Sequence, residues 1–212
     1  MAPYLSFKIH INHIHMNTIN ENTDYIFFDT ETTGVPRNYK APYTDTANWP
    51  RIVQISWLVV SEDQKVVRQE DHIIKPEGFI IPAESSDIHG ITHERALNEG
   101  EALKTIMDKF HKDVCKAKFV VGHNVSFDIN VSACECFRLQ KENPFEDKGI
   151  LCTMQSSTKF CKIPGRFGYK WPKLDELHMT LFGCHFDGAH NSLADIKATF
   201  DCFWELRKKG LI

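Results

Sequence analysis

Residues 25–36 have the sequence YIFFDTETTGVP, in which four apolar or aromatic residues precede two carboxylates, Asp29 and Glu31, that stand one residue apart. Side chains of a β-strand point alternately to its two faces, so residues i and i+2 share a face. If this stretch is a strand, its carboxylates lie together, and their charges repel unless a cation stands between them. An exposed strand end in a polar turn is the simpler interpretation of an isolated Asp-x-Glu pair. The rest of the chain decides between a cation site and an exposed strand end.

The composition is that of an ordinary globular protein. The chain has 212 residues, of which 42% are hydrophobic, enough for one domain with a substantial core. Its formal net charge of −3 gives no overall basic signature, so a polyanionic partner would be held by a local patch or through metal ions. Seven scattered cysteines without a C-x-x-C pair predict reduced thiols and a cytoplasmic location. No stretch reaches the ~18 apolar residues of a membrane span, so we expect no membrane partner.

The order of the predicted elements indicates an α/β fold with a mixed sheet. Three strands come first, and the polar turn SEDQK joins the second to the third, which predicts an antiparallel meander. Strands and helices then alternate, which favours parallel strands. The expected elements are strands over 25–29, 51–60, 66–75, 118–123 and 149–152, and helices over 99–115, 126–141, 172–182 and 191–208. We expect one domain over 24–212, preceded by a poorly ordered N-terminal extension over 1–23.

The last expected helix, 191–208, has two distinct faces. One is an apolar stripe of Leu193, Ile196, Phe200 and Phe203, and the other carries Asp195, Ala198, Thr199 and Cys202. Small side chains let backbones approach closely, so we expect the second face to lie against the sheet and bring Asp195 to the ends of the central strands. A solvated Asp195 is the alternative.

Acidic residues recur in three segments: DTETTG at 29–34, GHNVSFD at 122–128 and HNSLAD at 190–195. Each segment lies at the end of an expected strand or the start of an expected helix, and such positions converge on one crevice in open α/β sheets. The four carboxylates involved are Asp29, Glu31, Asp128 and Asp195. They cannot all be ionised in one crevice without compensating cations, and oxygen-only ligands favour Mg²⁺ or Mn²⁺. The sequence therefore predicts divalent cations between Asp29 and Glu31.

The order D-x-E-T-T-G, H-N-x-x-F-D, H-x-x-x-x-D resembles the DEDD 3′–5′ exonucleases. Within them it is similar to the His-containing, DnaQ-like branch, which includes RNase T and the proofreading subunit of bacterial replicative DNA polymerase. The resemblance covers about 24–208 and extends to IHGIT at 88–92 and KLDEL at 173–177. It implies a ribonuclease-H-like fold, a mixed five-stranded sheet of three antiparallel strands then two parallel ones, flanked by helices. The implied activity releases nucleoside monophosphates from 3′ ends of single-stranded DNA or RNA.

The resemblance also implies roles for five catalytic residues. Asp29, Glu31 and Asp195 would ligate one of two divalent cations, Mg²⁺ or Mn²⁺, and Asp29 would bridge to the second. Asp128 would act mainly through metal-bound water. His190 would be the general base for the attacking water, since imidazole accepts a proton near neutral pH; a structural histidine is the alternative. The cations would activate the water and stabilise the leaving 3′ oxygen.

Contacts to the substrate are suggested by the same resemblance. The main chain near Thr32 and Gly34 would meet the terminal nucleotide, Val35 and Ile88 would wedge against the last bases, and His89 and Asn124 would line the site. The 3′ polarity follows from the resemblance alone. One departure is the stretch PRNYKAPYTDTANWPR at 36–51, which is longer than the turn common in the family. It would either shape substrate choice or cover a sheet edge.

Residues 148–174 include six lysines and arginines and no acid, and aromatic residues alternate with the last of them. Basic groups follow phosphates and aromatic faces stack on bases, so we predict that Arg166 and Lys170, with Lys162 and Lys173, hold a single strand. The alternative is a solvated loop whose aromatic residues pack into the core.

Two other functions stay open. The chain could be a non-catalytic nucleic-acid-binding module or a subunit that binds a DNA polymerase, or a phosphodiesterase acting on dinucleotides. The complete acidic set with His190 favours catalysis. The sequence does not predict the oligomeric state.

Overall fold

The computed structural model describes residues 23–212, and its centre is a mixed five-stranded sheet in the order β3-β2-β1-β4-β5. The strands are β1 Thr23–Thr32, β2 Ile52–Ser61, β3 Val66–Ile73, β4 Phe119–Gly122 and β5 Gly149–Cys152. β1, β2 and β3 pair antiparallel, whereas β4 is parallel to β1 and β5 to β4. The expected sheet is confirmed. Of the predicted extension over 1–23, residues 1–22 lie outside the described part.

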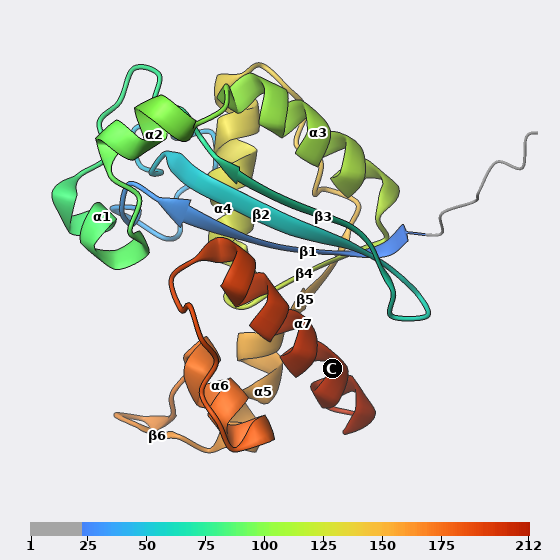
Figure 1. Cartoon of the computed structure of the whole chain (residues 1–212). Helices are drawn as coiled ribbons and strands as arrows, with labels where there is room; N and C mark the ends of the chain where they lie inside the picture. Colours follow the sequence, from blue (N-terminus) through green and yellow to red (C-terminus); the bar gives the residue numbers. More distant parts are fainter. Residues whose placement is uncertain (1–22) are drawn as a thin grey trace, which may run out of the picture.

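Helices cover both faces of this sheet, as Figure 1 shows. The main helices are α3 Leu103–Lys116, α4 Val125–Arg138, α6 Leu174–Phe182 and α7 Ser192–Lys208. Alternation along β1 decides which layer each residue meets. Ile26 and Phe28 belong to the core that includes α3 and α4, whereas Tyr25 and Phe27 belong to the core that includes α7. None of the helices described in 23–212 is long and apolar enough to cross a membrane.

Several elements occur where the sequence predicted none. They are α1 Ala83–His89, α2 His93–Glu99, α5 Thr153–Cys161 and a small hairpin of β6 Pro164–Gly165 and β7 Gly168–Tyr169. α1 and α2 have seven residues each, too few for a clear helical period, and Gly90 ends α1 in the left-handed region. α5 is rich in Ser, Thr and Gln and buries only part of one face, so its sequence resembles a loop.

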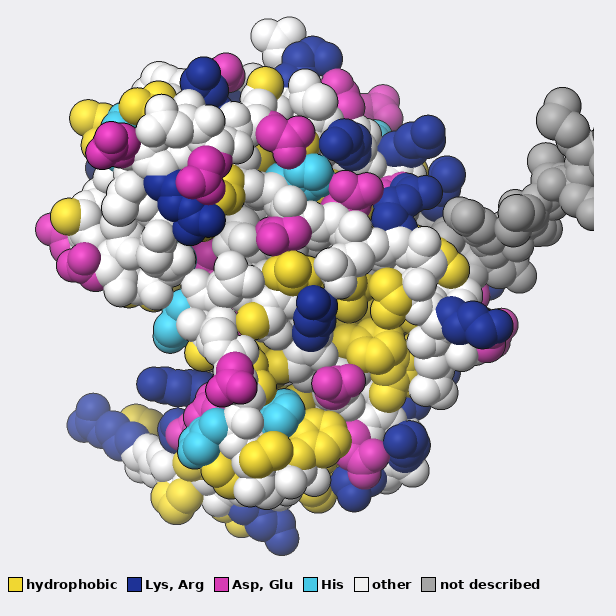
Figure 2. Space-filling view, in the orientation of Figure 1, with side chains coloured by type: hydrophobic (Ala, Val, Ile, Leu, Met, Phe, Trp, Pro, Cys, Tyr) yellow, Lys and Arg dark blue, Asp and Glu magenta, His cyan; other side chains and the backbone are white. Residues whose placement is uncertain are grey.

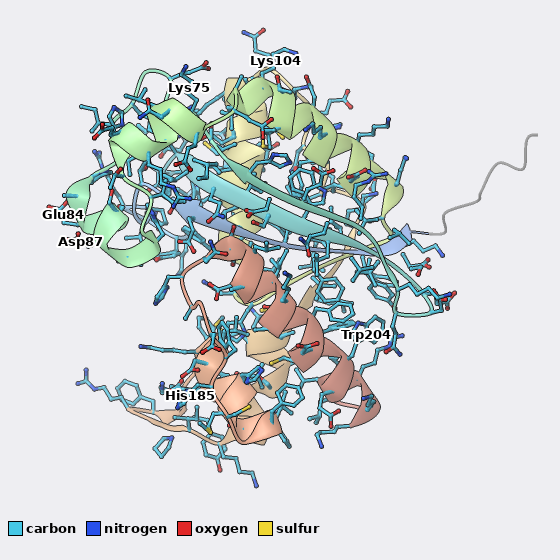
Figure 3. All side chains as sticks on the ribbon, viewed as in Figure 1. Lys75, Glu84, Asp87, Lys104, His185 and Trp204 are labelled. Carbon is cyan, nitrogen blue, oxygen red and sulfur yellow. The ribbon has the colours of Figure 1, made fainter. Side chains whose placement is uncertain are left out.

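Helix α7 lies on the sheet through a different face from the one expected. Ile196 and Phe203 of its apolar stripe pack with Phe27, and Trp204 packs edge-on against Tyr25 with ring centroids 5.4 Å apart (Figure 3). Cys202, from the small-residue face, packs instead with Leu177 of α6. The expected packing face was wrong because large apolar side chains bury more surface against the sheet, whereas small ones let a second helix approach. The expected placement of Asp195 is confirmed, because it lies with Asp29 and Glu31 at the end of β1.

Candidate active site

Three carboxylates meet at the carboxyl end of β1. One oxygen each from Asp29, Glu31 and Asp195 lies within 4.8 Å of the other two, and all three residues are partly buried. The strand dictates this arrangement, because Asp29 and Glu31 continue the face of β1 on which Phe27 packs against α7. Asp195 lies in the first turn of α7 and approaches from that side. The segments DTETTG and HNSLAD, far apart in sequence, thus form one acidic cluster, defined here as these three residues.

Asp128 is fixed beside this cluster from the opposite layer. It lies in the first turn of α4, and its Oδ1 accepts hydrogen bonds from the backbone N–H (3.1 Å) and the hydroxyl (2.7 Å) of Thr30. Thr30 stands between the two acids of β1. Asp128 is thereby held as an oriented neighbour of the cluster.

Burial raises the pKa of every acid in this group, and repulsion from neighbouring acids adds to it at Asp29, Glu31 and Asp128. The pKa of Asp29 lies well above its usual value because of burial and the charges of its three acidic neighbours. Burial, with Asp195 and Asp128, raises the pKa of Glu31 to about 8. Burial raises the pKa of Asp128 to about 7, although the hydrogen bonds from Thr30 lower it. Burial raises the pKa of Asp195 to about 6, although the neighbouring His190 lowers it. Excess negative charge on oxygen-only donors fits a divalent cation such as Mg²⁺ or Mn²⁺.

His190 lies in the turn before α7, with its side chain exposed. Its backbone is left-handed (φ 68°), and its N–H donates to Asp195 Oδ2 at 3.3 Å. Asn191 follows as the N-cap, and its side chain accepts the N–H of Ala194. The backbone bond ties His190 to the acidic cluster and leaves the imidazole facing solvent.

A buried pair of serines, which sequence reasoning missed, anchors the start of α7. Ser56 of β2 stands directly opposite Asp29 in the sheet, and its Oγ lies 2.5 Å from the Oγ of Ser192. Ser56 donates its hydrogen to Asp71 (2.7 Å), so Ser192 is the donor to Ser56. The only signal in the sequence was a serine within the apolar run IVQISWLVV. These bonds fix the helix that carries Asp195.

The predicted contacts to the terminal nucleotide surround the same strand end. Val35 and Ile88 are large apolar residues with most of their surface exposed. His89 is buried at the end of α1, and burial lowers its pKa while the main chain of Thr32 partly offsets this. Thr32 donates its hydroxyl to the Gly34 carbonyl at 2.6 Å.

Asn124 completes this set. It is exposed and left-handed (φ 64°) at the start of α4, a conformation that Asn tolerates. Its side chain makes no capping hydrogen bond to the helix, so it is free to meet a ligand.

The basic segment is partly helix and partly hairpin, and its aromatic residues are not in the core. Phe167, Tyr169 and Trp171 are 93%, 54% and 61% exposed, so the alternative of core packing is wrong. Arg166 lies at the hairpin turn with its guanidinium 5.2 Å from the Phe167 ring centre. Lys170 is ion-paired with Glu176 of α6 at 2.6 Å, an acid just beyond the segment.

Figure 2 shows a hollow on the left of the molecule, between the region of α1 and the region of the hairpin, with Lys and Arg side chains along its lower edge. β1 ends and α7 begins on this side of the sheet (Figure 1). The hollow therefore lies where a strand could run from the acidic cluster toward the hairpin.

The long stretch 36–51 packs on α4. Arg138 donates to the carbonyls of Thr46, Trp49 and Pro50, and Trp49 is buried in the core. These contacts anchor the stretch to α4, and both expected roles, shaping substrate choice and covering a sheet edge, stay predictions. Beside this stretch is a surface pocket of about 590 Å³ that Tyr43, Cys115 and Phe137 help to line, and its lining includes neither Asp128 nor any residue of the acidic cluster. The chemistry therefore points to the acidic cluster, not to this pocket.

Comparison with known proteins identifies the family. A family model described as exonuclease matches residues 26–203, which include all four acids and His190. The uncharacterized exonuclease CP81 of Escherichia phage 186 is 30% identical over 196 residues, covering 88% of this chain and 90% of the phage protein. The DNA polymerase III subunit epsilon-like protein of Rhodobacter capsulatus is 28% identical over 186 residues, which are 86% of this chain but 23% of that protein.

Among solved structures, E. coli exonuclease I in complex with a dT13 oligonucleotide has a TM-score of 0.68 at 21% identity. The match covers 87% of this chain and 40% of exonuclease I, so this chain spans less than half of that enzyme. At this identity the likeness shows the common fold, which is the expected ribonuclease-H-like arrangement. Because the family match runs from β1 into α7 and includes every acid of the site, the chain is a nuclease that belongs to the DEDD exonuclease family.

Proposed function

We propose that this protein is a metal-dependent 3′–5′ exonuclease that releases nucleoside monophosphates from the 3′ ends of single-stranded DNA or RNA. The observation that carries the proposal is the cluster of Asp29, Glu31 and Asp195, whose oxygens lie within 4.8 Å of one another beside the buried Asp128. Such a cluster is costly without a cation, and the exonuclease relatives supply the reaction class.

Two divalent cations, Mg²⁺ or Mn²⁺, are the proposed cofactors. Asp29, Glu31 and Asp195 would hold one, and Asp29, with Asp128 acting mainly through water, would hold the second. When bound, such cations lower the pKa of water, so that hydroxide is available to attack a phosphodiester, and they stabilise the charge on the leaving oxygen. Thr30 orients Asp128, and the serine pair orients Asp195, so the protein holds its ligands in place before the substrate arrives.

His190 is the proposed general base. Its exposed ring can accept the proton of the attacking water, while its backbone N–H keeps the turn against Asp195. Because this bond involves the backbone, it survives replacement of the imidazole, which makes the role testable.

The substrate contacts complete the proposal. The main chain near Thr32 and Gly34 would meet the terminal nucleotide. Val35 and Ile88 would wedge against the last bases of the strand, and His89 and Asn124 would line the site. Arg166 would contact phosphates further along the strand, and Lys170 would do so only in addition to its ion pair with Glu176. The complex of exonuclease I with dT13 supports a single-stranded substrate. The epsilon-like relative supports a DNA polymerase as a candidate partner, and a cytoplasmic location is consistent with seven free cysteines.

The test uses DNA and RNA oligonucleotides of one sequence, labelled at the 5′ end, with Mg²⁺, with Mn²⁺ and with EDTA. We expect a ladder that shortens one nucleotide at a time with either metal and no change with EDTA. Internal cuts, or loss of nucleotides from the 5′ end, would contradict the proposal. Hydrolysis of dinucleotides without hydrolysis of longer strands would favour a phosphodiesterase instead.

A further inference from the structure

The hairpin and the residues that follow it expose three aromatic rings. We call residues 162–173 the arm. Phe167, Tyr169 and Trp171 expose more than half of their surface, although large aromatic side chains are normally well buried. Side chains of the hairpin point away from the rest of the molecule (Figure 3). Such a concentration of exposed rings indicates a surface that binds something.

The base of the arm is fixed to the start of α4. His123, which follows β4, is partly buried, and this burial lowers its pKa to about 4, so its ring is neutral. Its Nε2 donates to the Pro172 carbonyl and its Nδ1 accepts from the Thr153 hydroxyl, each at 3.0 Å. Lys170 adds the ion pair with Glu176. Since His123 directly precedes Asn124 and α4 carries Asp128, the arm is tied to the same element as the acidic site.

The charges of the arm favour a polyanion. The segment 148–174 has no acid, and within residues 23–212 neither Lys162 nor Arg166 forms an ion pair. Both side chains are exposed. The arm therefore offers cations for phosphates and rings for flat apolar groups, the combination that single-stranded nucleic acid requires.

The spacing of the rings also suits bases. Residues i and i+2 of an extended chain share a face and lie about 6.6 Å apart, which is close to twice the ~3.4 Å spacing of stacked bases. Tyr169 and Trp171 have this separation in sequence, with the ion-paired Lys170 between them.

We propose that the arm binds unpaired nucleotides upstream of the 3′ terminal one by stacking their bases on Phe167, Tyr169 and Trp171, and so selects single strands over duplexes. The inference rests on the proposed function. In a duplex each base is already paired and stacked on its neighbours, so the rings gain contact only after strands separate. A single strand offers its bases without that cost.

The kinetic test uses the double variant Phe167→Ala/Trp171→Ala on single strands of increasing length. We expect KM for a ten-nucleotide strand to rise by roughly tenfold for each ring lost, with kcat nearly unchanged. The rise should be absent for a dinucleotide and for a nitrophenyl thymidine phosphodiester, and small for a blunt duplex. Phe137→Ala is the matched control, because Phe137 is 47% exposed at the far end of α4.

Trp171→Phe should keep the wild-type KM, since a ring remains. An unchanged KM in the double variant would overturn the proposal. Equal losses on the long strand and on the nitrophenyl ester would overturn it as well, because they would mean damage to the acidic site.

Binding can be measured without catalysis. Trp171 is exposed, whereas Trp49, Trp57 and Trp204 are buried, so fluorescence quenching at the surface reports on the arm. Titration with an oligothymidylate in EDTA should quench the tryptophan fluorescence of the wild type and leave the fluorescence of Trp171→Phe unchanged. Persistent quenching in that variant would contradict the proposal. Quenching by a strand that the wild type never degrades would refute the exonuclease function while leaving the arm as a binding surface.

Discussion

The acidic cluster and the arm are opposite kinds of surface. The cluster places partly buried carboxylates at the end of a central strand, where Asp195 accepts a hydrogen bond from the backbone of His190. The arm exposes apolar rings on a two-stranded hairpin that is attached mainly at its base. Each is unfavourable for folding alone, the first by repulsion and desolvation and the second by exposed apolar area. Under the proposed function, the two costs serve different parts of one ligand, the scissile phosphate at the cluster and the bases at the arm.

The largest expected effect is at the cluster. Asp29→Ala should reduce hydrolysis of every substrate to near background, because Asp29 is the ligand proposed to contact both cations. The fold should persist, since the change removes a partly buried carboxylate that its acidic neighbours repel. The hydrolysis rate tests the loss of activity, and the melting temperature in EDTA tests whether the fold persists. Asp147→Ala is the control, because Asp147 is exposed. Turnover above a few per cent in a folded variant would refute the two-cation site.

A smaller loss is expected at the general base. His190→Ala should lower kcat by roughly 10²–10⁴-fold on long and short substrates alike, while calorimetry still detects Mn²⁺ binding. His185→Ala is the matched control, because His185 is exposed in the same turn region and paired with Asp175 (Figure 3). Loss of Mn²⁺ binding would instead make His190 a ligand.

The metal-free protein should lose stability as pH rises. The folded state holds a proton on Glu31, whose pKa is raised to about 8, whereas the unfolded chain releases it near pH 4.3. The folded state binds more protons between these values, so stability falls by at most about 1.4 kcal/mol per pH unit, less because Glu31 is partly exposed. In EDTA the melting temperature should fall between about pH 5 and pH 8.

Added Mg²⁺ should restore the melting temperature at about pH 8, because cations bind deprotonated carboxylates. Glu31→Gln should flatten the profile in EDTA. A melting temperature that rises across this range would show that the cluster does not behave as described.

Loss of the bond between Ser56 and Ser192 should impair catalysis at the acidic cluster and leave binding at the arm unchanged. Ser56→Ala leaves Ser192 and Asp71 without their shared partner, and an unsatisfied buried group costs about 1–3 kcal/mol. We expect kcat to fall about tenfold on the oligonucleotide and on the nitrophenyl ester together, unlike the arm variants. Ser132→Ala is the control, because Ser132 is buried with no hydrogen-bond partner among residues 23–212. A selective loss on long strands would refute the anchoring role.

The smallest effect concerns one cation of the arm. Arg166→Ala should raise KM for a single strand a few-fold and reduce its salt dependence by about 0.7 log units per log unit of salt. Hydrolysis of the nitrophenyl ester should not change. Lys170→Ala should flatten the salt dependence less, because Lys170 is already paired with Glu176. Identical slopes for Arg166→Ala and the wild type would exclude a phosphate contact at Arg166.

The sheet and the meeting of the carboxylates could be predicted from the sequence alone. Both depend on local rules: alternation along a strand places Asp29 and Glu31 on one face, and acids at element ends converge where the strands stop. The order of the five catalytic candidates along the chain indicated the family that the comparisons confirmed.

Tertiary structure alone decided which face of α7 meets the sheet, that Ser56 reaches Ser192, and that the rings of the arm stay outside the core. Each depends on how much surface one arrangement buries compared with another, a sum over residues distant in sequence. A local sequence pattern contains no information about surface that is buried between residues distant in the chain. The serines of the buried pair therefore do not stand out in the sequence, and the exposed aromatic residues of the arm look like core residues.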